Sequence, residues 1–342
     1  MKQILHIFLL LTALPTLSQS CPACSNPALQ SNERIAAGLD SLSSGNLRLA
    51  LNFARGFDFQ GGHPNYKGLN QQGQVTNVPL HHHKVSLDFT RVELQAEYSF
   101  APNWTLWLQV PVDFKQQVAS VEFTEPVDET QREEIIRNRD IHHRNENYSG
   151  ISDISLLISR RYTGLLGTRD RLDVALGTTI PTGKTEENPL TAGDNGEKHL
   201  HIQFGTGTLN PKLELHYASR LSAKWFVTFY TINKWALAEN SLGYKAPNES
   251  TNGISLGYDL SRIFSIRGSV VNFYQSVAKW DGNKDPNSGI IAFNSNIGLS
   301  ALFGKTMISG IYRIPIQQRA LESQGDTFTF GPTIVFSISM RI

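Results

Sequence analysis

Histidine is the residue of this sequence whose distribution most invites a chemical explanation. Eight of the ten histidines fall in three polar stretches, namely His63, His81, His82, His83, His142, His143, His199 and His201. Neutral imidazole is a common ligand of borderline transition metals such as Cu and Zn. If the three stretches converge, the sequence predicts a Cu or Zn site built from His81, His82, His83, His142, His143, His199 and His201. The alternative is that these histidines are ordinary polar residues of solvated loops.

The only two cysteines stand close together near the N-terminus, in the sequence Cys21-Pro-Ala-Cys24. A chain of this length with two adjacent cysteines has no disulfide scaffold. Three interpretations remain for the pair: a local disulfide or redox pair, a pair of soft metal ligands, or acylation of Cys21. Acylation is disfavoured because Ser18 stands where an acylation signal has a branched apolar residue. In the metal hypothesis, Cys21 and Cys24 receive the ion from the histidines.

Motifs for enzymatic chemistry are weak. The segment Gly177 to Thr185 resembles a phosphate-binding loop, but five residues instead of four separate its glycines. A lipase would need a Ser–His pair with an orienting third group, and His142, His143 and Ser149 supply the residue types without a recognisable arrangement. The sequence therefore predicts a protein that is not an enzyme.

The N-terminus has the features of an export signal. Lys2 precedes an apolar run from Ile4 to Leu14, and the small residues Ser18 and Ser20 follow. This pattern predicts a signal peptide over residues 1–20 and a periplasmic lead-in over 21–45. No later stretch approaches the roughly twenty apolar residues of a membrane helix. The balance of 31 basic and 30 acidic residues argues against a nucleic-acid partner.

Residues 46–342 alternate between apolar and polar positions in repeated segments. The last segment is typical, because every even position from Phe328 to Ile342 is apolar and most odd positions are small or polar. Strands alternate their side chains with a period of two, so one face of each segment can meet lipid. The twelve strands predicted in this way lie near 47–57, 85–100, 106–114, 154–162, 172–180, 213–217, 225–235, 254–260, 264–270, 291–303, 308–316 and 327–342. In the second, the apolar positions change from odd to even, which predicts a bulge near Thr90.

Long and short connections alternate along this series. Long polar loops are expected near 60–84, 115–148, 181–202, 236–250, 276–287 and 317–326, with short turns between them. Bacterial outer-membrane barrels have long outer loops and short periplasmic turns. The sequence thus predicts an all-β, antiparallel up-and-down transmembrane barrel of twelve strands, monomeric and surrounded by the lipid of a bacterial outer membrane. Charged residues on the face opposite the apolar one should line the lumen: Arg48, Arg91, Glu93, Glu97, Asp153, Arg161, Asp173, Glu214, His216, Arg267, Arg313 and Arg341.

Three motifs carry a resemblance to a known family. They are Tyr148-Ser-Gly-Ile-Ser-Asp-Ile-Ser-Leu-Leu, Ile180-Pro-Thr-Gly-Lys184 and Arg313-Ile-Pro-Ile316. From about Leu47 to Ile342, the chain resembles the outer-membrane channel family named for phenol meta-cleavage pathways, which is related to fatty-acid and aromatic-hydrocarbon transport barrels. The resemblance implies a barrel that passes a small solute. The Cys-Pro-Ala-Cys segment, the histidine-rich loops and the terminal Ile342 depart from the family pattern.

Three functional hypotheses follow. The first is a channel that lets a small solute diffuse across the outer membrane along a narrow or partly plugged path, because twelve strands enclose little space. The second is a barrel that binds or takes up Cu or Zn through the histidines and the cysteine pair. The third is a structural barrel that transports nothing.

Overall fold

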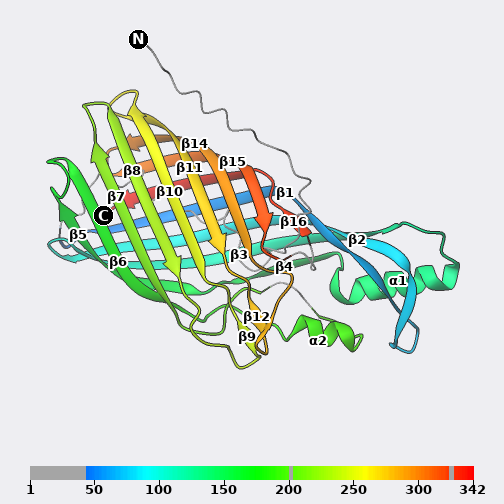
Figure 1. Cartoon of the computed structure of the whole chain (residues 1–342). Coiled ribbons are helices and arrows are strands. Elements are labelled where there is room, and N and C mark those ends of the chain that lie inside the picture. Colours follow the sequence, from blue (N-terminus) through cyan, green and yellow to red (C-terminus); the bar gives the residue numbers. More distant parts are fainter. Residues whose placement is uncertain (1–43, 200–202, 323–326) are drawn as a thin grey trace, which may run out of the picture.

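Twelve antiparallel strands close into a single barrel (Figure 1). The computed structural model describes residues 44–199, 203–322 and 327–342. Each strand pairs with its neighbour in sequence, and β1 (Leu47–Leu69) closes the barrel by pairing with β17 (Thr333–Arg341) from Arg48 opposite Arg341 to Gly56 opposite Thr333. The predicted fold class and strand number are confirmed.

The remaining barrel strands follow in chain order. They are β2 (Val75–Ala101), β3 (Trp104–Phe123), β4 (Glu146–Ile151), β5 (Ile154–Thr163), β6 (Asp170–Ile180), β7 (Asn210–Arg220), β8 (Trp225–Lys234), β10 (Glu249–Asp259), β11 (Phe264–Gln275), β14 (Ile290–Phe303), β15 (Thr306–Ala320) and β16 (Thr327–Thr329). Both β4 and β5 pair with β3, and both β16 and β17 pair with β1, so each of these two pairs fills one position around the barrel.

The two ends of the barrel differ in their connections. At the end where the C-terminus lies, short turns join β2 to β3, β5 to β6, β7 to β8, β10 to β11 and β14 to β15 (Figure 1). At the other end lie the helices α1 (Glu129–His142) and α2 (Pro189–Asp194) and a small sheet of β9 (Tyr244–Lys245), β12 (Lys279–Trp280) and β13 (Asn283–Lys284). The predicted signal peptide, residues 1–20, and all but the last two residues of the predicted lead-in, 21–45, lie outside the described residues.

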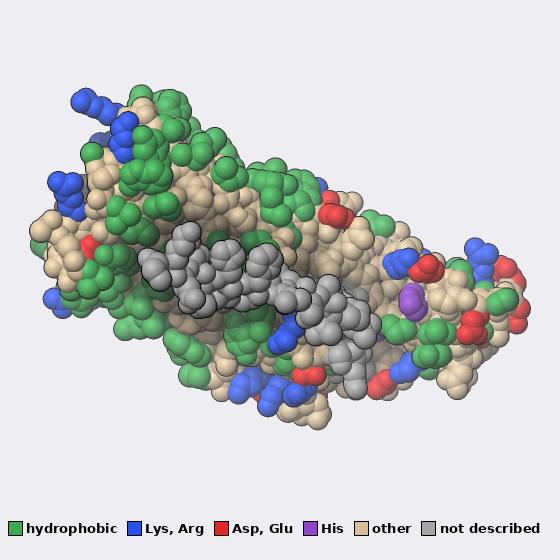
Figure 2. Space-filling model, turned by 45° about the horizontal axis from the view of Figure 1, so that its top comes forward, with side chains coloured by type: hydrophobic (Ala, Val, Ile, Leu, Met, Phe, Trp, Pro, Cys, Tyr) green, Lys and Arg blue, Asp and Glu red, His purple; other side chains and the backbone are tan. Residues whose placement is uncertain are grey.

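The outer surface of the barrel is apolar. Leu51, Leu94, Phe229, Ile297 and Phe336 are all exposed, and hydrophobic side chains cover much of the barrel in Figure 2. Near the short turns, aromatic side chains gather: Trp225 packs against Tyr258 with ring centroids 4.8 Å apart, and Arg160 lies over the rings of Trp104 and Tyr162. An apolar band with aromatic residues at its edge is the surface that a bilayer requires of a barrel. Among the described residues, no helix is long and apolar enough to span a membrane.

The predicted bulge near Thr90 is wrong. The ladder between β2 and β3 runs without interruption from His81 opposite Phe123 to Ser99 opposite Thr105. Odd residues of β2 face the interior over this whole length; Val85, Leu87 and Phe89 are buried there although they are apolar. The change in the apolar pattern at Thr90 therefore reflects a change in surroundings: before Thr90 the apolar residues of β2 pack inside, and after it they lie on the outer surface.

A bulge does occur in β1, where the pairing with β2 shifts between Gly56 and Phe59. Asp58 adopts a positive φ of 57°, a conformation that aspartate tolerates better than most residues. Even residues of β1 face the interior before the bulge, as Asn52 and Ala54 do, whereas the odd residue Phe59 faces it afterwards. The bulge thus reverses which residues of β1 point inward.

The predicted loop 60–84 is largely extended strand, and the predicted loop 115–148 contains strand at both ends and the helix α1 between them. Residues 60–69 and 75–84 continue β1 and β2 beyond the barrel as a hairpin, and β3 continues to Phe123 (Figure 1). The hairpin turns at Asn70, whose side chain accepts hydrogen bonds from the backbone N–H groups of Gln72 and Gln74. Gly73 has a φ of 78°, which glycine adopts without strain. Polar composition misled the loop prediction, because a strand in water needs no apolar outer face.

The last predicted strand is also interrupted. Between β16 and β17, Phe330 is buried and its ring lies 5.6 Å from that of Phe59. The alternation had placed Phe330 on the lipid face with the other even residues. From Ile334 to Met340 the even residues are exposed on the outer surface, as the pattern predicts.

Candidate functional site

The interior of the barrel has two layers of different chemistry. The layer nearer the long connections is apolar, with Phe59, Phe89 and Phe330 at its centre, and Phe59 and Phe89 lie 5.2 Å apart. Its other buried members are Ala54, Val85, Leu87, Ala119, Tyr148, Phe273, Ile290, Ala292, Ile311 and Val335. This layer, called the apolar layer below, narrows the outer part of the lumen.

Ion pairs fill much of the rest of the interior. Arg91 makes a bidentate pair with Asp113, with both N···O distances 2.7 Å. The Asp173 carboxylate forms ion pairs with Nε of Arg161 at 2.7 Å and with Nε of Arg171 at 3.0 Å. Several of these side chains are almost fully buried, so their charges depend on one another for stabilisation.

Further along the barrel wall, Glu214 is completely buried and pairs with Lys212 and with Nε2 of His216, each at 2.9 Å. Lys234 pairs with Glu249 at 2.8 Å. Arg48 pairs with Glu97 at 3.0 Å. The last two pairs cross-link neighbouring strands, β8 to β10 and β1 to β2, whereas Lys212, Glu214 and His216 all lie on β7.

The other predicted lumen residues lie at the two ends of this network. Arg91, Glu93 and Asp153 line a cavity of about 130 Å³ toward the long connections. Arg48, Arg267 and Arg341 line a larger cavity at the short-turn end. Arg313 is buried in the wall, where its Nε donates to Oδ1 of Asn296 at 3.2 Å.

Sequence reasoning missed several interior charges. Lys234 lies on β8, whose aromatic residues on both faces concealed its orientation, and Glu249 fell in a predicted loop. Lys115 also fell in a predicted loop, yet it is buried against Phe204, with Nζ 4.6 Å from the ring centroid. Its Nζ donates to the carbonyl oxygen of Gln203 at 2.9 Å. The alternation of β3 beyond Phe114 is the signal that could have found Lys115.

The cavity at the short-turn end has a volume of about 790 Å³ and a strongly basic lining. It is called the basic cavity below. Its charged residues are Arg48, Arg220, Lys224, Asp259, Arg262, Arg267, Lys305 and Arg341. Seven of these are basic and one is acidic. Arg220 pairs with Asp259 at 2.7 Å, and Arg48 pairs with Glu97, outside the lining, at 3.0 Å.

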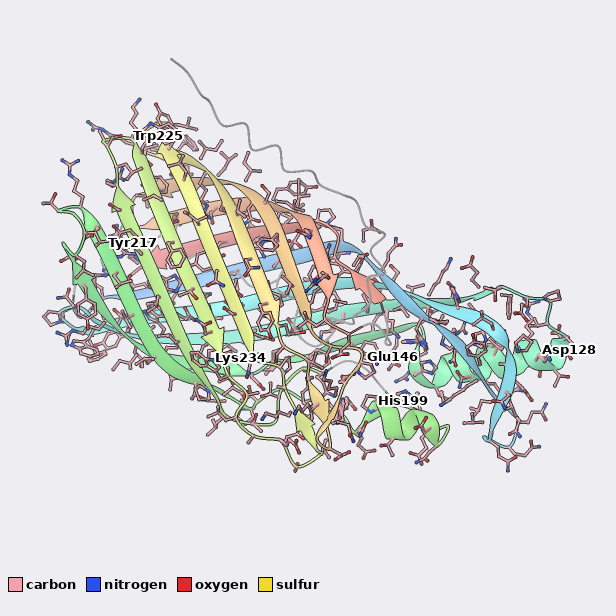
Figure 3. The ribbon with its side chains drawn as sticks, in the orientation of Figure 1. Asp128, Glu146, His199, Tyr217, Trp225 and Lys234 are labelled. Carbon is pink, nitrogen blue, oxygen red and sulfur yellow. The ribbon has the colours of Figure 1, made fainter. Side chains whose placement is uncertain are left out.

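The histidines gather outside the barrel, where α1 lies against the extended hairpin of β1 and β2. Asp128 caps the N-terminus of α1, because its side chain accepts a hydrogen bond from the backbone N–H of Gln131. The helix ends at His142, which is buried. Figure 3 shows Asp128 at the end of α1 far from the barrel. Because His63 and His83 are directly paired across the β1–β2 ladder, their side chains share the face on which α1 lies.

Four histidines place ligand nitrogens within 4.8 Å of one another: His63, His83, His142 and His143. These four are called the histidine cluster below. Nε2 of His63 lies 3.1 Å from Nε2 of His143, and Nδ1 of His83 lies 3.0 Å from Nε2 of His142. His83, His142 and His143 are buried, and His63 is half-buried.

The other predicted metal ligands are not part of this cluster. His81 and His199 border it: Nε2 of His81 lies 3.1 Å from Nε2 of His83, and the His199 ring stacks 5.5 Å from that of His142. His82 points to the opposite face of β2, because adjacent residues of a strand alternate sides. Cys21, Cys24 and His201 lie outside the described residues.

The surroundings of His81 disfavour its charged form. Burial lowers the pKa of His81 below the ordinary histidine value, although a hydrogen bond to the carbonyl of Pro79 raises it, and His63 and His82 lower it further. Since a carbonyl only accepts, Nδ1 of His81 donates to Pro79 and Nε2 accepts from Nε2 of His83. Nδ1 of His83 is then the nitrogen with a lone pair toward the cluster.

Comparisons with known proteins concern the fold. No family model matches the sequence, and no curated protein matches it. Among solved structures, an outer-membrane channel from Pseudomonas putida F1 superimposes with a TM-score of 0.55 at 14% identity, over 88% of this chain and 97% of that one. The toluene transporter TodX of P. putida gives a TM-score of 0.40 at 8% identity, over 95% of each chain. A FadL homologue of P. aeruginosa gives 0.38 at 10% identity, over 94% and 93%.

The fold is that of an outer-membrane channel. This assignment of the fold rests on the similarity to the P. putida F1 channel, and it agrees with the resemblance of the sequence motifs. With its apolar outer surface and closed set of strands, the barrel belongs in a bacterial outer membrane.

Proposed function

We propose that this protein is a passive channel for small anionic solutes. The observation that supports the proposal is the basic cavity at the short-turn end, with seven basic side chains against one acidic. A concave surface with low-dielectric walls and one sign of charge concentrates ions of the opposite sign. Small anions are therefore the solutes that this entrance favours.

The polar interior argues against an apolar solute. Arg91, Lys212 and Lys234 line the smaller cavity together with Glu93, Asp153 and Glu249. An apolar solute would have to displace water from these charged walls without replacing the hydrogen bonds that it removes. A small anion can exchange hydrogen bonds with arginine and lysine along the wall.

The path is narrow. Buried ion pairs and the apolar layer both occupy the interior of the barrel. Passage of a solute then requires side chains to move, which favours small solutes and a low single-channel conductance.

The test is ion selectivity in planar bilayers. The purified barrel should conduct, and under a KCl gradient its reversal potential should show preference for chloride over potassium. Replacing Arg267 and Arg341 together by glutamine should move the reversal potential toward that of a non-selective pore, because two positive charges leave the basic cavity.

Arg160→Gln is the matched control. Arg160 lies at the same end of the barrel but is exposed on the outer surface over Trp104 and Tyr162, so its removal should leave selectivity unchanged. Cation preference in the native protein would contradict the anionic assignment. A barrel without conductance or solute flux in liposomes would instead be a structural barrel.

A further inference from the structure

We propose that the histidine cluster binds one divalent transition-metal ion, Zn²⁺ or Cu²⁺, outside the barrel. The site would join residues from β1, β2 and the C-terminal end of α1. It is separate from the basic cavity, so it does not depend on the channel proposed above.

The geometry of the cluster suits a small ion. Metal–nitrogen bonds of about 2.0–2.1 Å in a tetrahedral site place neighbouring ligand nitrogens about 3.3 Å apart. The two nitrogen pairs of the cluster are 3.0 and 3.1 Å apart, and all four ligand nitrogens lie within 4.8 Å of one another. Small side-chain rotations bring the four nitrogens to a common centre.

Contacts around the cluster orient its rings. Nδ1 of His63 lies 3.1 Å from the carbonyl oxygen of Pro64 and donates to it, which leaves the lone pair on Nε2 directed at His143. Nε2 of His83 donates to His81, which leaves Nδ1 directed at His142. Metal-binding histidines ordinarily donate their second ring N–H in this manner, and such contacts fix the tautomer that ligation requires.

The surroundings hold the ligands in place. Nδ2 of Asn65, on the same hairpin, donates to Oδ1 of the buried Asn138 on α1 at 3.0 Å, and the N–H of His143 donates to the carbonyl of Arg139. The backbone N–H of His199 donates to the carbonyl of Ile141 at 2.9 Å. The helix end and the hairpin are thus fixed to each other before an ion arrives. Because four neutral imidazoles are borderline ligands, they favour Zn²⁺ and Cu²⁺ over Mg²⁺ and Ca²⁺.

The experiment is metal titration of the complete mature protein, folded in detergent and carrying no polyhistidine tag. Cys21 and Cys24 are replaced by serine in every sample, so that only the histidines can supply soft or borderline ligands. Zn²⁺ and Cu²⁺ are titrated separately, and Co²⁺ reports a tetrahedral nitrogen site by its visible absorption. One ion should bind per chain in each titration, with Cu²⁺ tighter than Zn²⁺, as nitrogen ligands in general bind them.

The variants compare two adjacent residues of one strand. His83→Gln removes a ligand and should weaken binding by at least about 10-fold, the lower end of what loss of even an orienting contact costs. His82→Gln, on the opposite face of β2, should leave affinity unchanged. His63→Gln, at a half-buried position, repeats the test if His83→Gln does not fold.

Three outcomes would overturn the proposal. One is binding no tighter than that of free imidazole. Another is equal loss of affinity in His82→Gln and His83→Gln. The third is unchanged affinity in both His83→Gln and His63→Gln.

Discussion

The two halves of β2 have opposite chemistry on both of their faces. In the half near the short turns, Arg91 and Glu93 point inward while Leu94 points outward. In the other half, Leu87 is buried inside while Ser86 is exposed outside. One strand with one unbroken ladder therefore crosses from lipid into water, and the apolar side chains change face at the crossing.

The comparison teaches that a barrel can obtain stability in two different ways along its axis. In the membrane half, lipid covers the apolar outside and ion pairs cross-link the inside. From the level of Ala54 and Val335 into the water half, the inward apolar side chains form a packed core as in a soluble protein, and α1 covers the hairpin. The predictions below test whether the two halves respond to substitution as these different surroundings require.

The largest effect should come from the apolar layer. Phe59→Ala removes a fully buried ring that contacts Phe89 and Phe330, and it should lower the free energy of unfolding by about 3–5 kcal/mol. Because the layer narrows the lumen, conductance should rise as well. Urea unfolding followed by tryptophan fluorescence measures the first effect and planar bilayers the second.

Phe53→Ala, on the same strand but exposed to lipid, is the control for that variant. Lipid or detergent fills the space that the lost ring leaves, so the loss of stability should be much smaller. Equal losses at Phe53 and Phe59 would show that the apolar layer is not a packed core.

The next largest difference between the two halves should be the loss of stability caused by an arginine on the outer face. Leu94→Arg puts a cation against the hydrocarbon of the membrane half and should cost about 2–4 kcal/mol if Leu94 lies near the midplane. Ser86→Arg, eight residues earlier on the same face, lies in water and should change stability by no more than about 0.5 kcal/mol. Assembly into liposomes and unfolding in urea measure both. Similar costs at the two positions would refute the boundary placed at Thr90.

The smallest effect should be local to the water half. Asp128→Ala removes the N-cap of α1 and should destabilise that helix by about 1 kcal/mol. Hydrogen exchange should accelerate in α1 while the unfolding midpoint of the barrel stays unchanged. A fall in the midpoint of the barrel would mean that α1 and the membrane half unfold together.

Alternation predicted the membrane half well. Leu51, Leu94 and Phe336 are exposed on the outer surface, as their register requires, because lipid on one side imposes one regular pattern. The pattern failed where the surroundings changed. It placed a bulge at Thr90, where only the environment reverses, and it missed the bulge at Asp58, whose effect on the pattern is concealed by the glycines on either side of Phe59.

The sequence predicted that histidines from distant segments come together, but it did not predict which four of them form the cluster. It included His82, since a run of three histidines does not show which residues share a face until the region is known to be a strand. It omitted His63 from the predicted ligands, and the direct pairing of His63 with His83 is visible only once residues 60–84 are known to form a hairpin of two strands.

The closing pair of strands also bears on how the barrel is made. Because β1 pairs with β17, the first and last strands must meet before the last two open strand edges are sealed from lipid. Contacts between such distant residues form slowly, since the intervening chain must be ordered first. The barrel can therefore close only after β17 has been synthesised, and until then β1 offers an open edge to which other chains could add.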